Sequence, residues 1–211
     1  MSRTDWHDWH GDYGDPHSAL AQRLLVVQRV IGNVLDSRDD AELRVLSVCA
    51  GNGADVVGAI ARCPRRTRIV GRLVELDAGL AGQALGRIEA AGLDSIEVVA
   101  RDASTTDAYL GAVPADLVLV CGVFGNIADS DVARTVQAMP QLCAHGASVV
   151  WTRHRRSPDL TPRIREWFQE AGFPERTFES PGTGSWSVGV NEFLGTPQRL
   201  ETGQRLFTFL R

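Results

Sequence analysis

The sequence predicts an α/β fold with a doubly wound, seven-stranded, mostly parallel sheet, helices on both faces and a C-terminal antiparallel hairpin. First, short apolar segments alternate with helical ones through the first five strands, a pattern typical of a parallel sheet. Second, residues 115–127 have an almost continuous apolar core, as in strands covered on both faces. Third, strand-like segments follow one another directly after residue 173, which predicts the hairpin at an edge of the sheet.

The part of the chain before the first strand, residues 1–40, is predicted to be a lid segment followed by a helix, and residues 41–211 are predicted to form a single domain. Over residues 18–35, apolar side chains recur on one helical face, and Ser18 has the chemistry of an N-cap. Residues 6–13 are rich in tryptophan and histidine. Two interpretations are open for them: a lid over a ligand site, or a segment whose tryptophans pack on the edge of the core.

The remaining elements follow from apolar runs and from residues that end helices. Expected strands cover residues 44–49, 67–76, 96–103, 115–127 and 147–154. Expected helices cover residues 54–62, 78–93, 105–111, 129–144 and 162–172. Three of these helices are expected to stop at Pro64, Gly92 and Gly146. Three further strand-like segments cover residues 175–180, 185–195 and 204–211.

Composition narrows the class of protein. The 211 residues suffice for one domain with a sizeable core, and the formal net charge of −4 argues against a dedicated nucleic-acid binder. The four cysteines include no CxxC pair, so reduced thiols in a cytoplasmic protein are the simplest interpretation. The first residues are unlike a signal peptide, and no apolar run is long enough to span a bilayer, so we expect no membrane partner.

The stretch RVLSVCAGNGADVVG, residues 44–58, predicts a strand, a ligand-binding turn and a helix. Gly51 and Gly53 have no Cβ atom, so the backbone can turn sharply and a ligand can approach it closely. A helix that begins after the turn directs unpaired N–H groups, and the positive end of its dipole, toward whatever lies there. The alternative is a simple strand-to-helix turn in which glycine provides only tightness.

Acidic residues follow the second and third expected strands. Because ligands of a doubly wound sheet bind at the carboxyl ends of the strands, Glu75, Asp77 and Asp102 are candidates to face one ligand. A carboxylate after the second strand offers two acceptor oxygens to the two hydroxyls of a ribose. An acid after the third strand can accept a hydrogen bond from the exocyclic amine of adenine. These positions predict an adenosine site, with the charged arm of the ligand over the glycine turn.

With these motifs in this order, the chain resembles the class I S-adenosylmethionine-dependent methyltransferases. The segment VLSVCAGNG is similar to the first motif of that family, LVEL to its acidic ribose-binding motif, ARDA to its adenine motif and ADLVLVCGVFGNI to its fourth motif. The resemblance extends from Val45 to Leu210 and includes the late antiparallel hairpin. It implies that residues 41–211 form a Rossmann-like methyltransferase domain whose cofactor is S-adenosyl-L-methionine.

The strand ends and the resemblance together name the expected site. The expected cofactor-binding residues are Tyr13, Cys49, Ala50, Gly51, Asn52, Gly53, Glu75, Leu76, Asp102, Ala103, Cys121, Gly122 and Phe124. Tyr13 belongs to the lid and is expected on the carboxylate or sulfonium side of the cofactor, while Phe124 either stacks near the adenine or forms a wall of the substrate pocket. Asp77 is the alternative to Glu75 as the ribose ligand. Glu75 is preferred because it ends the strand, which leaves Asp77 to cap the next helix.

Two positions depart from the first motif of the family. The usual acid falls at Ser47, which supplies no charge to the methionine amino group or to the waters around it. The usual first glycine falls at Cys49. These departures keep open the alternative of a homologue that binds the cofactor without catalysis.

Methyl transfer needs little chemistry from the protein, because the sulfonium is an activated methyl donor. The protein has to hold a nucleophile in line with the methyl group, and a base is needed where that nucleophile carries a proton. Candidate bases or substrate contacts are His10 in the lid segment and Arg153 and His154 after the fifth strand, where a solvated loop is the alternative. No catalytic residue is assigned. The acceptor is expected to be a small molecule, in a site closed by the lid or by a second copy in a homodimer.

Two other chemistries are disfavoured. No metal is expected, because the spacing of histidines and aspartates in residues 6–13 fits no standard metal site. A nicotinamide-dependent oxidoreductase is an alternative that uses a similar sheet. Its glycine fingerprint is incomplete here, since Val56 stands at the third glycine position, and the terminal hairpin disagrees with it.

Overall fold

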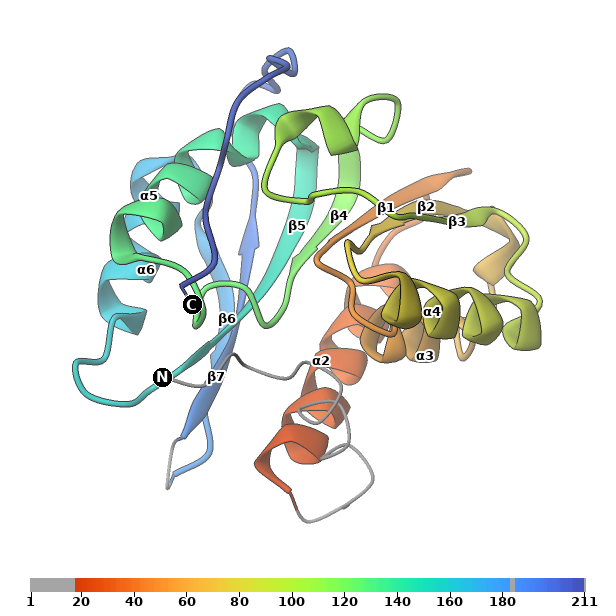
Figure 1. Cartoon of the computed structure of the whole chain (residues 1–211), viewed down its shortest axis with the longest axis horizontal. Coiled ribbons are helices and arrows are strands. Elements are labelled where there is room, and N and C mark those ends of the chain that lie inside the picture. Colours follow the sequence, from red (N-terminus) through yellow and green to blue (C-terminus); the bar gives the residue numbers. More distant parts are fainter. Residues whose placement is uncertain (1–17, 183–184, 211) are drawn as a thin grey trace.

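The computed structural model describes residues 18–182 and 185–210 and confirms the α/β fold class (Figure 1). Seven strands form one sheet in the order β3-β2-β1-β4-β5-β7-β6. The strands are β1 Leu43–Val48, β2 Ile69–Val74, β3 Ile96–Val99, β4 Ala115–Val120, β5 Cys143–His154, β6 Glu175–Glu179 and β7 Trp186–Glu192. The helices of the described part are α2 Ala19–Asp36, α3 Ala54–Ile60, α4 Ala78–Ala91, α5 Asp129–Ala138 and α6 Thr161–Glu170, with short 3-10 helices at Arg66–Arg68, Thr106–Tyr109 and Met139–Gln141.

Strands β1 to β5 pair in parallel, as the helices between them require. From β1 the chain builds outward to β2 and β3, and then returns to the other side of β1 to form β4 and β5. The order of the strands therefore reverses between β1 and β4. A doubly wound sheet opens a crevice at the carboxyl ends of the strands where such a reversal occurs.

The late hairpin is present, but its second strand does not lie at the edge. Strand β7 runs antiparallel between β5 and β6, so β6 forms the edge and has the same direction as β1 to β5. Strand β7 is buried almost throughout, whereas β6 carries the exposed Arg176 and the partly exposed Glu175 and Glu179, charged residues that suit an edge. The close fit needs glycine at one point, since a Cβ on Gly189 would lie 2.2 Å from Cε2 of Trp151.

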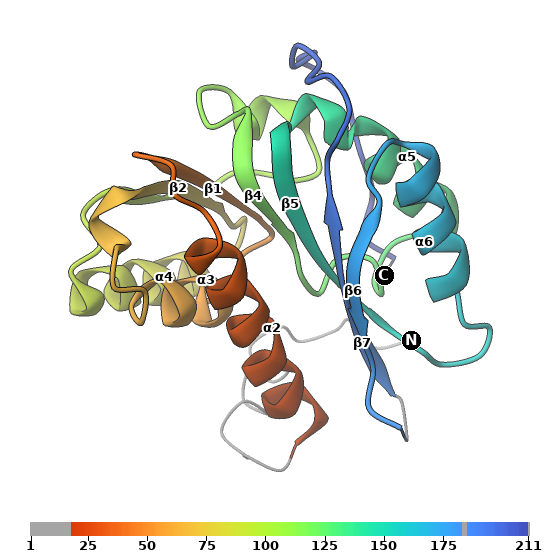
Figure 2. The ribbon, with the colours of Figure 1, turned by 180° about the vertical axis from the view of Figure 1, so that it is seen from behind.

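Helices cover both faces of the sheet, as predicted (Figures 1 and 2). On one face α2, α3 and α4 enclose an aliphatic core that includes Ile31 and Ile60. On the other face α5, α6 and the C-terminal segment enclose a second core that is rich in aromatic rings. Ser18 caps α2 as expected, because its Oγ accepts a hydrogen bond from the Ala21 N–H at 3.0 Å.

Several predicted boundaries are wrong. The helix expected over residues 129–144 ends at Ala138, because Pro140 lacks the N–H that an α-helix needs, and β5 already begins at Cys143. The helix expected over 105–111 is only the 3-10 helix Thr106–Tyr109. The strand expected over 96–103 ends at Val99, so the residues that follow it belong to a loop.

The last segment, expected as a strand over 204–211, is irregular in its described part. It makes only isolated bridges, from Arg205 to Thr105 and from Phe209 to Ile127. Its backbone is nevertheless held at two loops, because Leu206 N–H donates to the Ser104 carbonyl and Leu210 N–H to the Asn126 carbonyl, each at 2.8 Å. The segment thus contacts the loops that follow β3 and β4. Among the helices of the described residues, none has the length and apolarity needed to traverse a bilayer.

Candidate functional site

A pocket of about 490 Å³ opens at the carboxyl ends of β1, β2, β3 and β4. It lies where the order of the strands reverses. Its lining residues are Arg23, Cys49, Ala50, Gly51, Asn52, Ala54, Asp55, Glu75, Leu76, Asp77, Ala78, Leu80, Asp102, Ala103, Cys121, Gly122 and Phe209. Most of the residues that the sequence places in a cofactor site therefore meet in one cavity, although they come from four separate strand ends.

Glu75 joins two of these strand ends. One carboxylate oxygen accepts a hydrogen bond from the Gly51 N–H at 2.8 Å, and the other accepts from the Asp77 N–H at 2.9 Å. The residue is 9% exposed and lines the pocket. Because each carboxylate oxygen has two lone-pair directions, both oxygens retain capacity for a hydroxyl donor in the pocket. The backbone amides thus fix the carboxylate without saturating it.

Asp77 has a structural task, as the sequence predicts. Its side chain accepts a hydrogen bond from the Leu80 N–H at 2.9 Å and caps α4. Between the two acids, Leu76 is 65% exposed and lines the pocket. A large apolar side chain left open beside a nucleoside-sized cavity offers a surface on which a flat ring could pack.

The turn after β1 explains its unusual sequence. Cys49, Gly51 and Gly53 have φ angles of 54°, 57° and 69°, so every second residue lies in the left-handed region. That region favours glycine, and Cys49 adopts it at a steric cost. Gly53 does not line the pocket. A Cβ there would lie 3.1 Å from Leu73 and 3.3 Å from Ala84, so the expected cofactor contact at Gly53 is replaced by close packing against β2 and α4.

Asp102 stands at the β3 side of the pocket. Its side chain accepts a hydrogen bond from the Ser104 N–H at 2.9 Å, and Arg205 lies 3.5 Å away. Burial acts to raise the pKa of Asp102, but the hydrogen bonds from Ser104 and the positive charge of Arg205 outweigh burial and leave the pKa below its ordinary value. The carboxylate is therefore ionised at neutral pH and accepts hydrogen bonds only.

The two pocket cysteines are held as thiols. Burial, reinforced by the negative charges of Glu75 and Asp102, raises the pKa of Cys49. Burial raises the pKa of Cys121 well above its ordinary value, and Asp55 adds to this effect while Arg23 opposes it. A neutral thiol is a weak nucleophile, so neither residue has the environment of a reactive cysteine.

Six lining residues escaped the sequence analysis, and three of them have charged or aromatic side chains; the six are Arg23, Ala54, Asp55, Ala78, Leu80 and Phe209. Arg23 comes from α2, Asp55 from the first turn of α3 and Phe209 from the C-terminal segment. Arg23 and Phe209 carry no local signal, because only the folded chain brings them to the strand ends. Asp55 had one signal, since it is an acid four residues after Gly51 in the stretch that the sequence analysis singled out.

Two expected site residues turn into the core instead. Phe124 has no exposed surface and packs against Trp151 and Phe168, with ring centroids 6.1 and 6.4 Å apart, so it neither stacks in the pocket nor walls it. Arg153 is 8% exposed, donates to the Phe124 carbonyl and lies 3.5 Å from Asp129. Its guanidinium therefore stabilises the turn after β4 and does not form an anion-binding rim.

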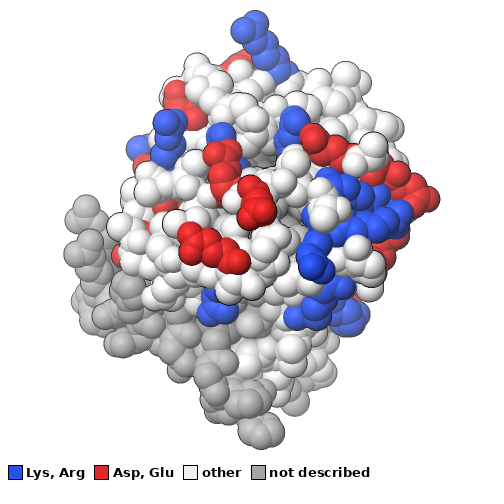
Figure 3. Space-filling model, turned by 90° about the vertical axis from the view of Figure 1, so that its right-hand side faces the viewer, with Lys and Arg blue, Asp and Glu red and all other residues white. Residues whose placement is uncertain are grey.

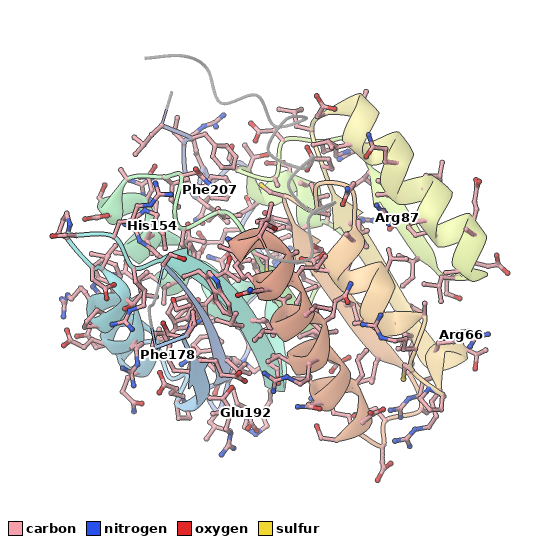
Figure 4. All side chains as sticks on the ribbon, turned by 90° about the horizontal axis from the view of Figure 1, so that it is seen from below. Arg66, Arg87, His154, Phe178, Glu192 and Phe207 are labelled. Atoms are coloured by element: carbon pink, nitrogen blue, oxygen red, sulfur yellow. The ribbon has the colours of Figure 1, made fainter. Side chains whose placement is uncertain are left out.

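His154, labelled in Figure 4, ends β5. It is not among the residues that line the pocket. Burial lowers the pKa of His154, and the positive charges of Arg153 and Arg156 lower it further. Its Nδ1 is buried without a hydrogen-bond partner in the described part of the chain. The other two candidates from the sequence, His10 and Tyr13, lie outside the described residues.

Among the described residues that line the pocket, Arg23 is the one arginine. Figure 3 shows arginines gathered toward one side of the face at the right of Figure 1, with acidic side chains beside them. In the segment 65–68, Arg65 pairs with Asp39 at 2.7 Å, and Arg68 donates to backbone carbonyls, including that of Leu35 at 3.1 Å. This segment precedes β2, so it lies at the amino ends of the strands, whereas the pocket lies at their carboxyl ends. Within residues 18–182 and 185–210, no group of three or more His, Cys, Asp or Glu side chains could hold a metal ion.

Comparison with known proteins identifies the fold. No protein-family model matches the chain, and no curated protein sequence matches it. Among solved structures, the chain is similar to magnesium protoporphyrin IX methyltransferase from Synechocystis PCC 6803 with bound S-adenosylmethionine (TM-score 0.66, 13% identity, 90% of each chain covered). It is also similar to an rRNA methylase from Streptococcus thermophilus (TM-score 0.60, 13% identity, 79% of this chain and 95% of that one).

A third similar structure is an O-methyltransferase family protein from Burkholderia thailandensis (TM-score 0.62, 16% identity, 86% of this chain covered). The present chain spans 58% of the length of that protein. At these identities the likeness concerns the fold. The chain has the fold of the class I S-adenosylmethionine-dependent methyltransferases, as its motifs predicted.

Proposed function

We propose that this protein binds S-adenosyl-L-methionine in the pocket at the strand ends and transfers its methyl group to an acceptor. The observation that carries the proposal is Glu75, a nearly buried carboxylate that is fixed by the Gly51 and Asp77 amides and faces the pocket. In this fold the acid that ends the second strand is the expected partner of a ribose. The volume of the pocket and its mixture of apolar and acidic lining suit a nucleoside.

The residues on the β2 and β3 side would hold the adenosine. Glu75 would accept hydrogen bonds from the ribose hydroxyls, and Asp102 would accept one from the exocyclic amine of the base. Leu76 and Ala103 would provide apolar surface beside them. The backbone of Ala50 to Asn52 would lie under the rest of the cofactor, where the absence of a side chain on Gly51 leaves room.

When bound, the sulfonium supplies an activated methyl group, so the protein has mainly to bind, orient and exclude water. The lining residues of the described part include no histidine, and the two cysteines are neutral. We therefore assign no general base. The chain would supply a positioned cofactor, and Phe209 of the C-terminal segment gives the pocket an aromatic side chain beside which an acceptor could lie.

A small-molecule acceptor is favoured over a nucleic acid. The pocket is lined by four acids and one arginine, and the arginine that the sequence placed on its rim, Arg153, is buried. A nucleic acid requires positive charge to neutralise its phosphates. The negative net charge of the chain points the same way. Enclosure of the acceptor by a second copy of the chain, and a cytoplasmic location, remain predictions.

The alternatives make different demands on the same pocket. A nicotinamide-dependent oxidoreductase would have glycine where Val56 is fully buried in the core, and its sheet would not contain β7 between β5 and β6. A homologue that only binds the cofactor would share the pocket but would not convert S-adenosylmethionine to S-adenosylhomocysteine in the presence of any acceptor. Cys49, in place of glycine, is the feature that favours this second alternative.

The test is ligand binding by calorimetry with wild type, Glu75→Gln and the control Glu89→Gln, which alters an exposed acid of α4. Wild type should bind S-adenosylhomocysteine and not NAD. Glu75→Gln should weaken that binding about 10- to 100-fold, because hydrogen bonds to a charged group contribute roughly 1.5–3 kcal/mol. Glu89→Gln should bind as wild type does. Preferential binding of NAD, or an unchanged affinity in Glu75→Gln, would refute the proposal.

A further inference from the structure

The three pocket acids that follow β2 and β3 account for one side of the cavity only. Glu75, Asp77 and Asp102 follow β2 and β3, which lie to one side of β1, while β4 lies to the other side. On the β4 side the lining residues are Cys121 and Gly122, with Arg23 from α2 and Asp55 from α3. A ligand with its nucleoside on the first side must therefore place its remaining atoms toward this second side.

The second side carries a carboxylate, Asp55 in the first turn of α3, where an acid also suits the positive end of the helix dipole. Asp55 lines the pocket, and one of its oxygens accepts a hydrogen bond from the Val56 N–H at 2.7 Å. Within the described part of the chain, no arginine or histidine forms an ion pair with it. The carboxylate is close enough to Cys121 to act on that thiol electrostatically. Asp55 therefore brings a carboxylate to the cavity, and among the described residues the charge of Arg23 acts on it without a direct ion pair.

The motif that precedes Asp55 lacks its usual charge. Ser47 stands where the resembling family has an acid that serves the amino group of the cofactor. Ser47 is buried in β1 and does not line the pocket. The chain thus has no acid on β1, and it has an unexpected acid eight residues later at the same cavity.

We propose that Asp55 binds the ammonium group of the amino-acid end of the cofactor, and so supplies from α3 the charge that β1 lacks at Ser47. The inference rests on the proposed function, because it requires an S-adenosylmethionine-like ligand. A carboxylate and an ammonium group form a charge-assisted hydrogen bond, which is strong in a partly buried site. Arg23, at the same end of the pocket, adds positive charge near the place that the carboxylate of a zwitterionic ligand would take.

The electrostatics of the pocket agree with this assignment. Burial raises the pKa of Asp55, and the hydrogen bonds from the backbone and the charge of Arg23 only partly offset it. An isolated buried carboxylate is unfavourable, and a bound cation relieves that cost. Removing the negative charge of Asp55 should therefore not destabilise the ligand-free protein, so Asp55→Asn is a usable variant. The amide oxygen of asparagine can still accept from the Val56 N–H.

The experiment compares two ligands that differ only in the amino-acid part. S-adenosylhomocysteine carries the ammonium group, whereas 5′-methylthioadenosine has the nucleoside and the sulfur without it. Affinities are measured by calorimetry for wild type, Asp55→Asn, Glu75→Gln and the control Asp94→Asn, which alters an exposed acid before β3. Thermal unfolding without ligand checks that each variant is folded.

Asp55→Asn should lower the affinity for S-adenosylhomocysteine at least about tenfold. It should change the affinity for 5′-methylthioadenosine less than about twofold. Glu75→Gln should lower the affinity for both ligands, whereas Asp94→Asn should leave both affinities unchanged. An unchanged affinity of Asp55→Asn for S-adenosylhomocysteine, or an equal loss for both ligands, would overturn the role of Asp55. Failure of wild type to bind either ligand would instead refute the proposed function, so the two failures are distinguishable.

Discussion

The sheet has two sets of strand ends, those of β1 to β3 and those of β4 and β5, and the side chains near them are used differently. On the first side, the acids after β2 and β3 face the pocket and are held there by backbone amides. On the second side, Cys121 and Gly122 still line the pocket, but Phe124 after β4 and Arg153 near the end of β5 are buried. A position at the carboxyl end of a strand is therefore not enough to make a residue part of the site.

The difference comes from what covers each side. Beyond β4 and β5, the rings of Trp151, Phe168 and Phe173 build an aromatic cluster under α5 and α6, and Phe124 completes it. Arg153 then donates to the Phe124 carbonyl. On the β1 to β3 side, the residues that the structure describes form no such cluster over the strand ends. The cavity stays open, and exposed residues such as Leu76 remain available to a ligand.

The largest expected effect separates stability from binding. Phe124→Ala should lower the free energy of unfolding by about 3–5 kcal/mol, because it removes a fully buried ring. Leu76→Ala should change it by less than about 0.5 kcal/mol, since that side chain is exposed, and should weaken S-adenosylhomocysteine a few-fold. Denaturant unfolding and calorimetry at low temperature measure the two quantities. If Phe124→Ala lowered the affinity for S-adenosylhomocysteine while the free energy of unfolding stayed unchanged, Phe124 would belong to the pocket and not to the core.

A middle-sized effect tests the left-handed turn beside the pocket. Cys49→Val should be less stable than Cys49→Gly by about 1–3 kcal/mol, because a β-branched side chain is strained at a φ of 54°, where glycine is not. Denaturant midpoints of the two variants, with wild type between them, check the order. Val48→Ala, next to it in β1, provides a control for the loss of apolar volume. Equal stability of the valine and glycine variants would contradict a left-handed Cys49.

The smallest effect concerns pH at the strand ends of β4 and β5. Because the pKa of folded His154 lies below its ordinary value of 6.5, the unfolded chain binds a proton there that the folded chain does not. The free energy of unfolding should therefore fall as the pH drops from about 7 toward the pKa of folded His154. The charges of Asp159 and Asp129 raise that pKa and so partly offset the effect. His154→Asn should flatten this part of the curve of unfolding free energy against pH. An unaltered slope in the variant would place His154 in solvent.

The sequence alone was sufficient for the features that depend on neighbouring residues. Alternation of apolar and helical segments predicted the parallel strands, and Ser18 and Asp77 cap α2 and α4 as their positions suggested. The glycine turn and the acid at Glu75 were also foreseeable, because the carboxyl ends of parallel strands all lie at the same end of the sheet. Each of these inferences needs only a short stretch of chain and its local geometry.

Only the tertiary structure decided the features that join distant segments. It inserted β7 between β5 and β6, brought Arg23 and Phe209 to the pocket, and turned Phe124 into the aromatic core. Packing made these choices, since each depends on which partner fills the space beside a residue. A partner dozens of residues away leaves no periodic signal in the chain, so its effect becomes visible only when both are in place.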